Sequence, residues 1–367
     1  MNTHVTVLHV VSSLGSGGVE KFLYNCYMNI DRKLIKFDFI THNDCGIMEG
    51  KLSKEGSKIY HLSHRRKHPI KSAIEAYKIF KNTDYDIIHF HGNLEVCLEL
   101  LMAFLARKKI RISHVHTYFK NPSRFRKITN IFSKFILNML ATQHYACSRN
   151  AGEWGYGRKK LEKGKVSIIY SGIKIEEFIF NEAIREKKRK KMDLEDCLVV
   201  GNIGRLVHEK NHLFLLEIFQ TLIEINKNVV LIIAGDGPLK YLIEEEISKR
   251  DLTGKVRLLG ERSDINELLM VMDVFLLPSK NEGLGMVLVE AQVSGLISFV
   301  SNSVPEEVNI TGKVYALPLE ESPKVWAETI LNTSSFERFN EVNKMKKSSF
   351  DIKIISELLL KEYMQIK

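Results

Sequence analysis

The chain alternates short runs of β-branched residues with amphipathic segments of helical spacing, and this alternation restarts half-way along the sequence. The runs in the first half read VTVLHVV, KFDFITH, SKIYHL, DIIHFHG, RISHVHT, QHYACS and KVSIIY. The second series reads CLVVGNIG, VVLIIAG, KVRLLG, DVFLLP and LISFV. Strands that alternate with helices form parallel sheets with helices on both faces. The pattern therefore predicts an α/β protein with doubly wound sheets.

A charged stretch at residues 181–196 separates the two series, and we interpret it as a solvated helix or linker. The length of 367 residues also favours two domains. We expect a first domain at residues 1–174 and a second at residues 175–349. Residues 350–367 have apolar residues at helical spacing, which predicts a tail helix that packs back on the first domain.

The spacing of apolar residues also predicts which helix faces are buried. One expected face consists of Phe22, Leu23, Cys26, Tyr27 and Ile30. A second expected face consists of Ile70, Ala73, Ile74, Tyr77 and Phe80. A third consists of Leu94, Cys97, Leu98, Leu101 and Leu105.

Positive charge is concentrated in the first half of the chain. Residues 1–172 hold 28 Lys and Arg against 13 Asp and Glu, whereas the whole chain has a net charge of +10. A basic domain favours an anionic partner. Nucleic acid, an anionic membrane surface and a diphosphate-linked acceptor are the candidates.

Residues 118–140 mix cations with aromatic residues. Apolar residues repeat there at spacings of three and four, at Phe125, Ile128, Phe132, Phe135 and Met139. Arg124, Arg126, Lys127 and Lys134 lie off this stripe. Such a helix either lies at the interface of an anionic membrane or packs on the core with a basic solvated face. The sequence leaves both interpretations open.

The cysteines and the apolar runs restrict the compartment. The five cysteines are scattered without CxxC spacing, which is typical of a reducing cytosol and predicts no metal site. The chain has no apolar run of about 18 residues, the length needed to span a membrane. VTVLHVVSS reads as a strand rather than a signal peptide. Asp84 and Asp86 form an Asp-x-Asp pattern just before a strand, so we interpret Asp84 as a turn residue and assign no metal.

Two glutamates, Glu282 and Glu290, frame the segment NEGLGMVLVEA. A turn at Gly283 to Gly285 would lead into a helix that begins with MVLVEA. The start of a helix carries unpaired N–H groups and the positive end of the helix dipole, so it binds anions. A phosphate there would lie between two carboxylates that accept hydrogen bonds from hydroxyl groups. This arrangement favours a nucleotide sugar.

A glycine-rich loop, SSLGSGGVEKFL, follows the first strand. Ligands bind at the carboxyl ends of strands in open α/β sheets, so we interpret it as a functional loop. Gly15 and Gly17 match a dinucleotide fingerprint, but Glu20 stands where its third glycine belongs. A dehydrogenase is therefore a weak interpretation.

The second domain begins with a comparable loop, VVGNIGRLVHEKNH. Arg205 and Lys210 follow the strand and could clamp a diphosphate as it leaves. In AGDGP, Gly235 marks either a structural turn or a ligand contact. His116 and His91 close strands of the basic half, where a histidine can donate to a sugar hydroxyl. We favour a structural role for His91 and leave the role of His116 open.

Together these segments resemble the retaining glycosyltransferases of family 4, whose two Rossmann-like domains face a central cleft in the GT-B architecture. The matching segments run through nearly the whole chain in family order. They are SSLGSGGVE, YDIIHFHG, ISHVHT, ACSRNAGEWGYG, IIYSGIKIEEF, GNIGRLVHEKN, LIIAGDGP, VRLLGERSDINELL, FLLPSKNEGLGMVLVEAQVSG and SNSVPEEV. ACSRNAGEW and SVPEEV look most like enzymes that build bacterial capsule or exopolysaccharide.

The resemblance implies roles at the matching positions. Residues that it places at the reacting groups are Glu282, Arg205, Lys210 and His116. Residues that it places around the donor are Gly17, Gly18, Gly204, Gly235, Arg262, Leu284, Gly285, Met286 and Glu290. In this pattern Glu282 holds the donor sugar, Glu290 holds the ribose, and the N–H groups of the helix start meet the diphosphate.

The implied reaction moves a sugar from a nucleotide diphosphate donor, expected to be UDP-linked, with retained anomeric configuration. The resemblance implies no metal and no cofactor. The acceptor is expected to be a growing polysaccharide or a lipid diphosphate-linked oligosaccharide. The enzyme would then be cytoplasmic and peripheral at the inner face of the membrane. The alternatives are a catalytically silent scaffold of the same fold, an NAD(P)-dependent oxidoreductase and a nucleic-acid binder, and we expect no nucleic-acid partner.

Overall fold

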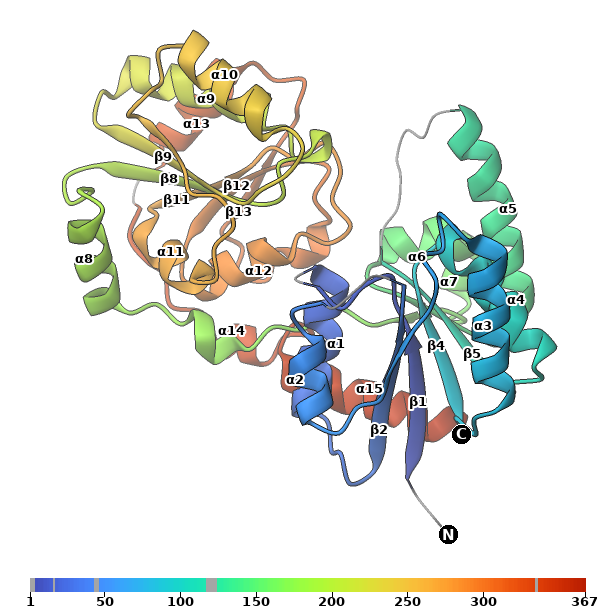
Figure 1. Cartoon of the computed structure of the whole chain (residues 1–367). Helices are drawn as coiled ribbons and strands as arrows, with labels where there is room; N and C mark the ends of the chain where they lie inside the picture. Colours follow the sequence, from blue (N-terminus) through green and yellow to red (C-terminus); the bar gives the residue numbers. More distant parts are fainter. Residues whose placement is uncertain (1–3, 16, 43–45, 117–123, 334–335) are drawn as a thin grey trace. The chain divides into compact units, whose positions relative to one another are not determined.

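The computed structural model describes residues 4–15, 17–42, 46–116, 124–333 and 336–367. The chain divides into two compact units (Figure 1). The first unit comprises Met1–Ile173 together with Ser349–Lys367, and the second comprises Lys174–Ser348. The tail of the chain therefore belongs to the same unit as its beginning.

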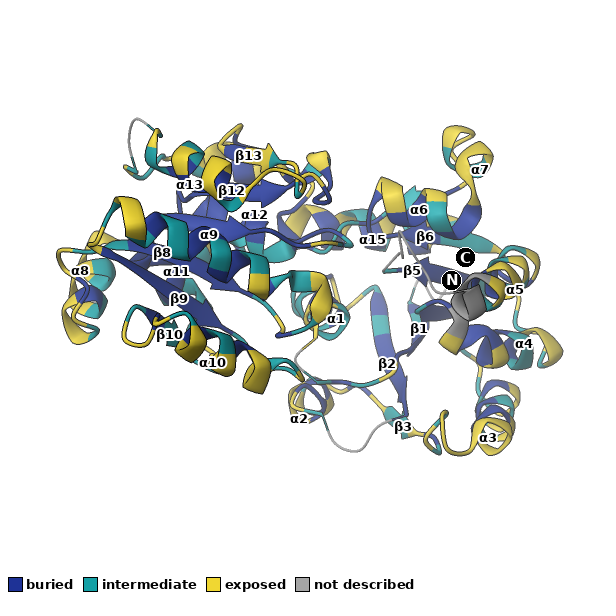
Figure 2. Cartoon of the chain, turned by 90° about the horizontal axis from the view of Figure 1, so that it is seen from above, coloured by how far each residue is buried: buried dark blue, intermediate teal, exposed yellow. Residues whose placement is uncertain are grey.

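The first unit contains, within the described residues, a seven-stranded parallel sheet in the order β3-β2-β1-β4-β5-β6-β7. Its strands are β1 (Val5–Val10), β2 (Ile35–Thr41), β3 (Ile59–His61), β4 (Ile87–His91), β5 (Ile110–Val115), β6 (Gln143–Ala146) and β7 (Ser167–Ile168). Central strands are buried on both faces (Figure 2), which explains their nearly continuous apolar sequences.

Helices cover both faces of this sheet. They are α1 (Gly18–Asn29), α2 (Glu49–Lys54), α3 (Pro69–Lys81), the 3₁₀ turn η1 (Leu94–Val96), α4 (Cys97–Leu105), α5 (Arg124–Leu140), α6 (Arg149–Tyr156), α7 (Arg158–Glu162) and α15 (Ile352–Ile366). One buried cluster joins the sheet to α1 and α15, and a second joins it to α3, α4 and α6. None of the described helices combines the length and the apolar character needed to cross a membrane.

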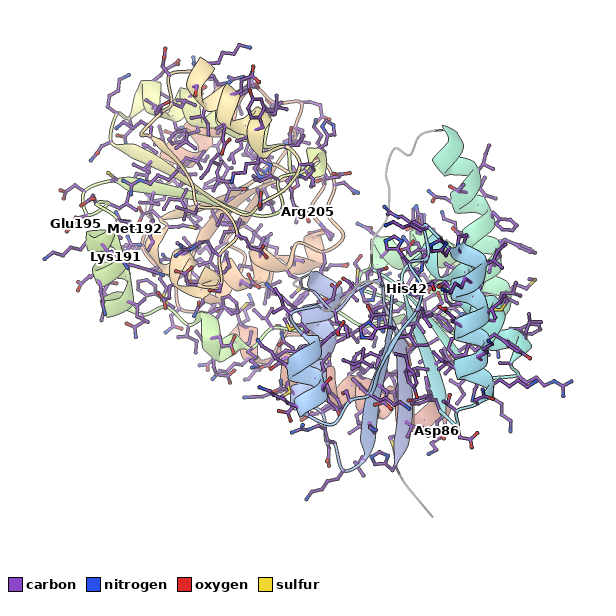
Figure 3. All side chains as sticks on the ribbon, viewed as in Figure 1. His42, Asp86, Lys191, Met192, Glu195 and Arg205 are labelled. Atoms are coloured by element: carbon purple, nitrogen blue, oxygen red, sulfur yellow. The ribbon has the colours of Figure 1, made fainter. Side chains whose placement is uncertain are left out.

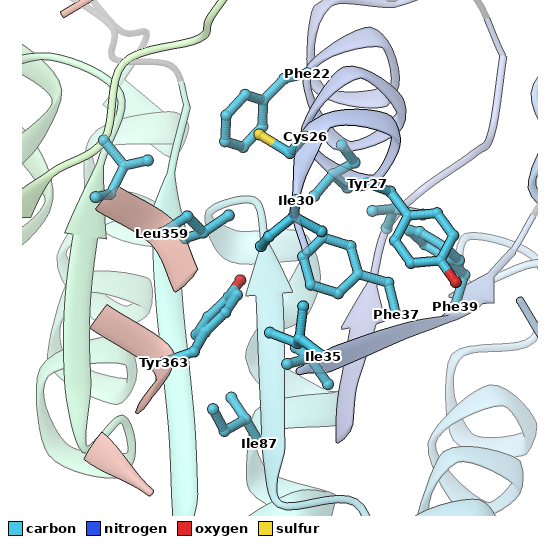
Figure 4. Close-up of a cluster of buried hydrophobic side chains, with 14 of the residues drawn as sticks. Phe22, Cys26, Tyr27, Ile30, Ile35, Phe37, Phe39, Ile87, Leu359 and Tyr363 are labelled. Carbon is cyan, nitrogen blue, oxygen red and sulfur yellow. The ribbon is translucent and has the colours of Figure 1, made fainter. Parts of the chain in front are cut away.

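The tail helix α15 is part of the core of the first unit. Its buried residues recur at helical spacing, at Ile352, Ile355, Leu359 and Tyr363. These side chains pack in one cluster with α1 and β2 (Figure 4). Asp351 caps the start of the helix, because its carboxylate accepts a hydrogen bond from the N–H of Lys353 at 2.8 Å.

Helix α1 buries the predicted residues, but α3 and α4 are rotated relative to the prediction. In α3, Ile70 is 75% and Ile74 49% exposed, while Ala73 and Ala76 are buried. Alanines let the helix axis come closer to the sheet than β-branched side chains do. In α4, likewise, the predicted Leu98 is 46% exposed.

Helix α5 packs on the core through Leu137 and Leu140, but it leaves a second set of apolar residues exposed to solvent. Ile131, Phe132 and Phe135 are 70%, 60% and 61% exposed, whereas Asn130 and Ser133 are buried. The predicted apolar stripe is therefore not the buried face of α5, although the helix does pack on the core. Arg124 to Lys127 have side chains outside the described part of the chain.

The second unit contains, within its described residues, a six-stranded parallel sheet in the order β10-β9-β8-β11-β12-β13. Its strands are β8 (Leu198–Ile203), β9 (Val229–Ala234), β10 (Val256–Leu258), β11 (Val274–Leu277), β12 (Ile297–Ser301) and β13 (Val314–Leu317). The predicted α/β class with parallel sheets is confirmed. The last strand, β13, is absent from the predicted series because two of its four residues are exposed and its apolar run is short.

Helices also cover both faces of this second sheet. They are α8 (Glu182–Lys191), α9 (His212–Ile225), α10 (Lys240–Lys249), α11 (Ile265–Val271), α12 (Met286–Val293), α13 (Pro323–Leu331) and α14 (Val342–Lys346), with 3₁₀ turns η2 (Ile175–Phe178), η3 (His208–Lys210) and η4 (Glu306–Val308).

The charged stretch between the two series forms α8, and two of its arginines have a structural role. Arg185 and Arg189 both form ion pairs with Asp273, at 2.5 and 3.0 Å. Arg185 also donates to the carbonyl oxygens of Met270 and Met272 at the end of α11. Cations at a helix C-terminus are favoured by the helix dipole. These contacts fix α8 on the second unit.

If α15 stabilises the first unit, Leu359→Ala will lower that unit's free energy of unfolding by about 2–5 kcal/mol, because the change opens a cavity in the core. Met364, which is 39% exposed on the same helix, provides the control. We expect Met364→Ala to change stability by no more than about 0.5 kcal/mol. Amide hydrogen exchange of β1 and β2 measures this unit separately from the other. Equal effects of the two substitutions would contradict the packing described.

Candidate active site

The start of helix α12 has the geometry of an anion site. Gly285 precedes the helix with φ +80° and ψ +52°, in the left-handed region that glycine adopts without strain. A Cβ atom at this position would meet nothing closer than Val304 Cγ1 at 3.9 Å, so the backbone conformation, and not crowding, requires the glycine. The first turn of a helix leaves N–H groups unpaired, and α12 begins at Met286, directly after Leu284 and Gly285 of the loop. Leu284 is buried and holds this loop on the unit.

A buried carboxylate lies in the loop before α12. Glu282 is only 6% exposed, and its Oε1 atom accepts hydrogen bonds from Lys210 Nζ at 2.5 Å and from Ser279 Oγ at 2.7 Å. Neither contact uses Oε2. The ion pair offsets part of the cost of burying the carboxylate, and the second oxygen is left for a hydroxyl donor.

The loop that follows β8 carries the lysine of this pair. Lys210 ends the turn η3, and its side chain crosses Gly204, where a Cβ atom would lie 3.3 Å from Lys210 Cε. The N–H of Lys280 donates to the carbonyl of Glu209 at 2.7 Å, which joins this loop to the one that carries Glu282. This hydrogen bond keeps the loop that carries Lys210 next to the loop that carries Glu282.

The AGDGP turn packs tightly against the same loop. Gly235 has φ +144°, and a Cβ atom there would lie 1.9 Å from the carbonyl oxygen of Gly204. A Cβ atom at Gly237 would lie 2.5 Å from the carbonyl oxygen of Leu206. Backbone packing thus requires glycine at both positions. No ligand contact is needed to explain why glycine stands there.

Three other predicted residues of this unit have different surroundings. The guanidinium of Arg205, labelled in Figure 3, is exposed and has no partner among the described residues. Arg262 forms a two-pronged contact with Asp264, both distances being 2.8 Å, and this contact raises the pKa of Arg262. Glu290 is partly buried in the second turn of α12. Arg205 is therefore available to an anion, whereas Arg262 already has a carboxylate partner.

In the first unit, the glycine-rich loop leads into α1. Gly17 caps that helix, and a Cβ atom there would lie 2.4 Å from Glu20 Oε2. Ser13 Oγ donates to the same carboxylate at 2.6 Å. Glu20 therefore folds back over the helix start, where a dinucleotide would place its phosphate. Gly18 has open space around its missing side chain.

His116 follows strand β5 and is partly exposed. Its Nε2 atom lies 2.9 Å from Nδ1 of His91. Burial lowers the pKa of His116 to about 3, so the ring is neutral at neutral pH. The residue can act there as a hydrogen-bond donor or acceptor, but not as a cation.

Ser279 is a contact of the site that sequence reasoning does not identify. It is fully buried and donates to Glu282, and its own carbonyl accepts from Ser303 at 2.6 Å. The sequence indicates this contact only through the position of Ser279, which lies after a strand and three residues before Glu282. Asp86, by contrast, accepts from the N–H and the hydroxyl of Thr6 at 2.8 and 3.0 Å and has a structural role.

Comparisons with known proteins agree on one family. Residues 16–177 match the model of Glycosyltransferase Family 4, and residues 183–347 match that of Glycosyl transferases group 1. The putative glycosyltransferase EpsF of Bacillus subtilis is 36% identical over 90% of this chain and 88% of its own length. The chain belongs to glycosyltransferase family 4.

Further relatives of this glycosyltransferase extend the comparison. The capsular polysaccharide biosynthesis glycosyltransferase CapH of Staphylococcus aureus is 28% identical over 98% of this chain and 99% of its own. An Escherichia coli UDP-Gal:alpha-D-GlcNAc-diphosphoundecaprenol alpha-1,3-galactosyltransferase is 32% identical over 64% of this chain and 62% of its own. The predicted relationship to bacterial capsule and exopolysaccharide enzymes is confirmed.

The fold of this glycosyltransferase also has solved counterparts. Anabaena Alr3699/HepE, crystallised with UDP-glucose, superposes with a TM-score of 0.80 at 20% identity, over 99% of this chain and 100% of the other. A sucrose-phosphate synthase from Thermosynechococcus elongatus superposes with a TM-score of 0.77 at 16% identity, over 99% of each chain. The predicted GT-B fold class is confirmed, and the dehydrogenase interpretation is wrong.

If Gly235 is required for close packing on Gly204, Gly235→Ala will destabilise the second unit by more than about 2 kcal/mol. Gly254→Ala is the matched control, because Gly254 has φ +83° but no atom within 4 Å of the place that a Cβ would take. We expect that control to cost about 1 kcal/mol, the strain of the backbone alone. Hydrogen exchange of β8 and β9 measures the difference, and similar losses in both variants would argue against the close contact.

Proposed function

We propose that this glycosyltransferase moves a sugar from a UDP-linked donor to a glycan acceptor and retains the anomeric configuration. The observation that carries the proposal is the Lys210–Glu282 pair beside the start of α12. It combines a cation, a carboxylate with one oxygen unused and a helix N-terminus. A nucleotide sugar presents a diphosphate and neighbouring hydroxyl groups, which are the complements of these three elements.

Breaking the bond to the sugar leaves negative charge on the diphosphate. Lys210, the exposed Arg205 and the N–H groups of the α12 start would stabilise that charge as it develops. Glu282 would hold a sugar hydroxyl through Oε2, and Glu290 would hold the ribose. With these positive groups the proposed reaction requires no metal. For retention we propose a front-face route, in which the departing phosphate takes the proton of the acceptor.

The acceptor that we propose is a lipid diphosphate-linked oligosaccharide of a capsule or exopolysaccharide pathway. The E. coli relative is named for such a diphosphoundecaprenol acceptor. The excess of positive charge in residues 1–172 suits a diphosphate acceptor and an anionic membrane surface.

The exposed apolar face of α5 supports peripheral binding at the inner face of the membrane. Ile128, Ile131, Phe132, Phe135 and Met139 are each more than half exposed, which is unusual for such side chains. Aromatic and aliphatic residues in this arrangement insert into the headgroup region of a bilayer, and nearby Lys and Arg residues attract anionic lipids. We propose that this face docks on anionic lipid.

Turnover of UDP-sugars tests the site. We expect Lys210→Ala and Glu282→Ala each to lower kcat about 100- to 1,000-fold, because each removes a group that holds the reacting part of the donor. Lys249→Ala removes an equally flexible cation of the same unit, 72% exposed, and should leave kcat unchanged. Near wild-type rates for Lys210→Ala and Glu282→Ala would exclude the site. A wild-type protein that turns over no UDP-sugar would be a silent scaffold instead.

Vesicle co-sedimentation tests the membrane proposal. The double change Phe132→Ser and Phe135→Ser should reduce binding to vesicles that contain anionic lipid by about tenfold or more, because the insertion of two aromatic rings would be lost. Ile225→Ser alters an exposed apolar residue of the second unit (54%) and should have no effect. Binding that is equally strong to neutral vesicles and insensitive to salt would contradict the proposal.

A further inference from the structure

Histidines gather on one face of the sheet in the first unit. Register explains this, because His9 of β1 lies beside His89 of β4, and His91 of β4 lies beside His114 of β5. His116 follows two residues later and points to the same face. The face is covered by α1 and α15, and the first four of these histidines are buried.

Two hydrogen bonds connect three of the rings into a chain. His9 Nδ1 lies 2.9 Å from His91 Nε2, and His91 Nδ1 lies 2.9 Å from His116 Nε2. His91 thus uses both of its ring nitrogens. His89 is bonded instead to Tyr363 Oη at 2.6 Å, and His114 has no ring-to-ring hydrogen bond among the described residues.

The three linked rings are neutral at neutral pH. Burial lowers the pKa of both His9 and His116 to about 3, and burial with neighbouring histidines holds the pKa of His91 well below its usual range. A neutral imidazole has one N–H donor and one acceptor nitrogen. Each ring in the chain must therefore donate in the same direction, so the tautomer of one ring fixes the tautomers of the others.

The buried end of the chain decides that direction. His9 Nε2 is buried without a hydrogen-bond partner, whereas His116 at the other end of the chain of rings is only partly buried. Burying an unpaired N–H is avoided more strongly than burying an unpaired acceptor. The proton of His9 therefore belongs on Nδ1, from which it donates to His91.

We propose that His91, backed by His9, is a positioning residue that fixes His116 as the Nδ1–H tautomer. His91 donates from Nδ1 to His116 Nε2, and His116 is left with a single N–H that is available to a ligand. This step rests on the proposed function: a hydroxyl or ring oxygen of a sugar substrate would accept a hydrogen bond from this N–H. The three linked histidines would thus present one neutral hydrogen-bond donor, the Nδ1–H group of His116.

The geometry favours hydrogen bonding over metal binding at these rings. Nitrogen atoms bound to one tetrahedral Zn²⁺ at about 2.0–2.1 Å are about 3.3 Å apart, which exceeds the 2.9 Å found in both contacts. His89 stacks on His91 with ring centroids 4.1 Å apart, and His114 lies against His116 at 3.9 Å.

Long-range ¹H–¹⁵N correlation spectra of ¹⁵N-histidine-labelled full-length protein measure the tautomers directly. The signals of the 13 histidines are assigned with single His→Gln variants. We expect the wild-type protein to show the Nδ1–H tautomer at His9, His91 and His116. The Nε2–H tautomer at His116 would overturn the proposal, and this measurement depends on no variant other than those used for assignment. Stoichiometric zinc that survives chelation would also overturn it.

His91→Phe tests the role of the middle ring. Without the His91 donor, we expect His116 to exchange between both tautomers, and kcat/KM for the donor to fall about two- to tenfold, the value of one hydrogen bond. His114→Phe is the matched control, since His114 is as buried and lies closer to His116 but does not link to it. It should leave the tautomer of His116 unchanged. If thermal unfolding shows that both variants are folded, and both change the tautomer of His116 and kcat/KM equally, then His91 contributes only packing.

The two readouts separate this inference from the proposed function. The tautomer is measured without any sugar donor. A wild-type enzyme with the Nδ1–H form but no turnover of UDP-sugars would overturn the proposed function and leave the role of His91 in fixing the ring intact. A wild-type enzyme with turnover but the Nε2–H form would overturn the inference alone.

Discussion

Parallel strand pairing is the constraint on which the rest of this structure depends. Because neighbouring strands in each sheet run in the same direction, their carboxyl ends and the loops that follow lie along one edge. In the second unit this brings the loops after β8, β9 and β11 together, although residues 204, 235 and 282 are far apart in sequence. In the first unit the same constraint places the histidines of β1, β4 and β5 in one row.

Close contact between backbone segments then brings the side chains of the candidate site together at that edge. Gly235 packs on the carbonyl of Gly204, and Gly204 in turn leaves room for the stem of Lys210. The ammonium of Lys210 reaches Glu282, which Ser279 holds from the other side. A Cβ atom at Gly235 would lie 1.9 Å from the carbonyl oxygen of Gly204, and one at Gly204 would lie 3.3 Å from Lys210 Cε. The proposed charge chemistry therefore depends on the absence of side chains as much as on the charged groups.

The first unit departs from the usual pattern in two places, because its apolar core also contains histidines and an apolar stripe of α5 is exposed. Its histidines remain neutral inside because burial disfavours their charged forms, and three of them are linked by hydrogen bonds. On α5, Phe132 and Phe135 face solvent while Asn130 and Ser133 are buried. Both features have a cost in stability, and we interpret both as consequences of function: donor contact for the histidines and membrane contact for α5.

The sequence by itself determined the described strands other than β13, the α/β class, the family and the buried face of α1, because periodicity and local motifs depend on neighbouring residues. It also predicted Glu282 and Gly285 from their spacing around a helix start, and Lys210 from its place in the loop after the first strand of the second series. Only the tertiary structure decided the rotation of α3, the outward apolar face of α5, the Ser279 contact and the chain from His9 through His91 to His116. These features depend on contacts between residues distant in sequence, and such contacts arise only when the strands pair and the helices pack.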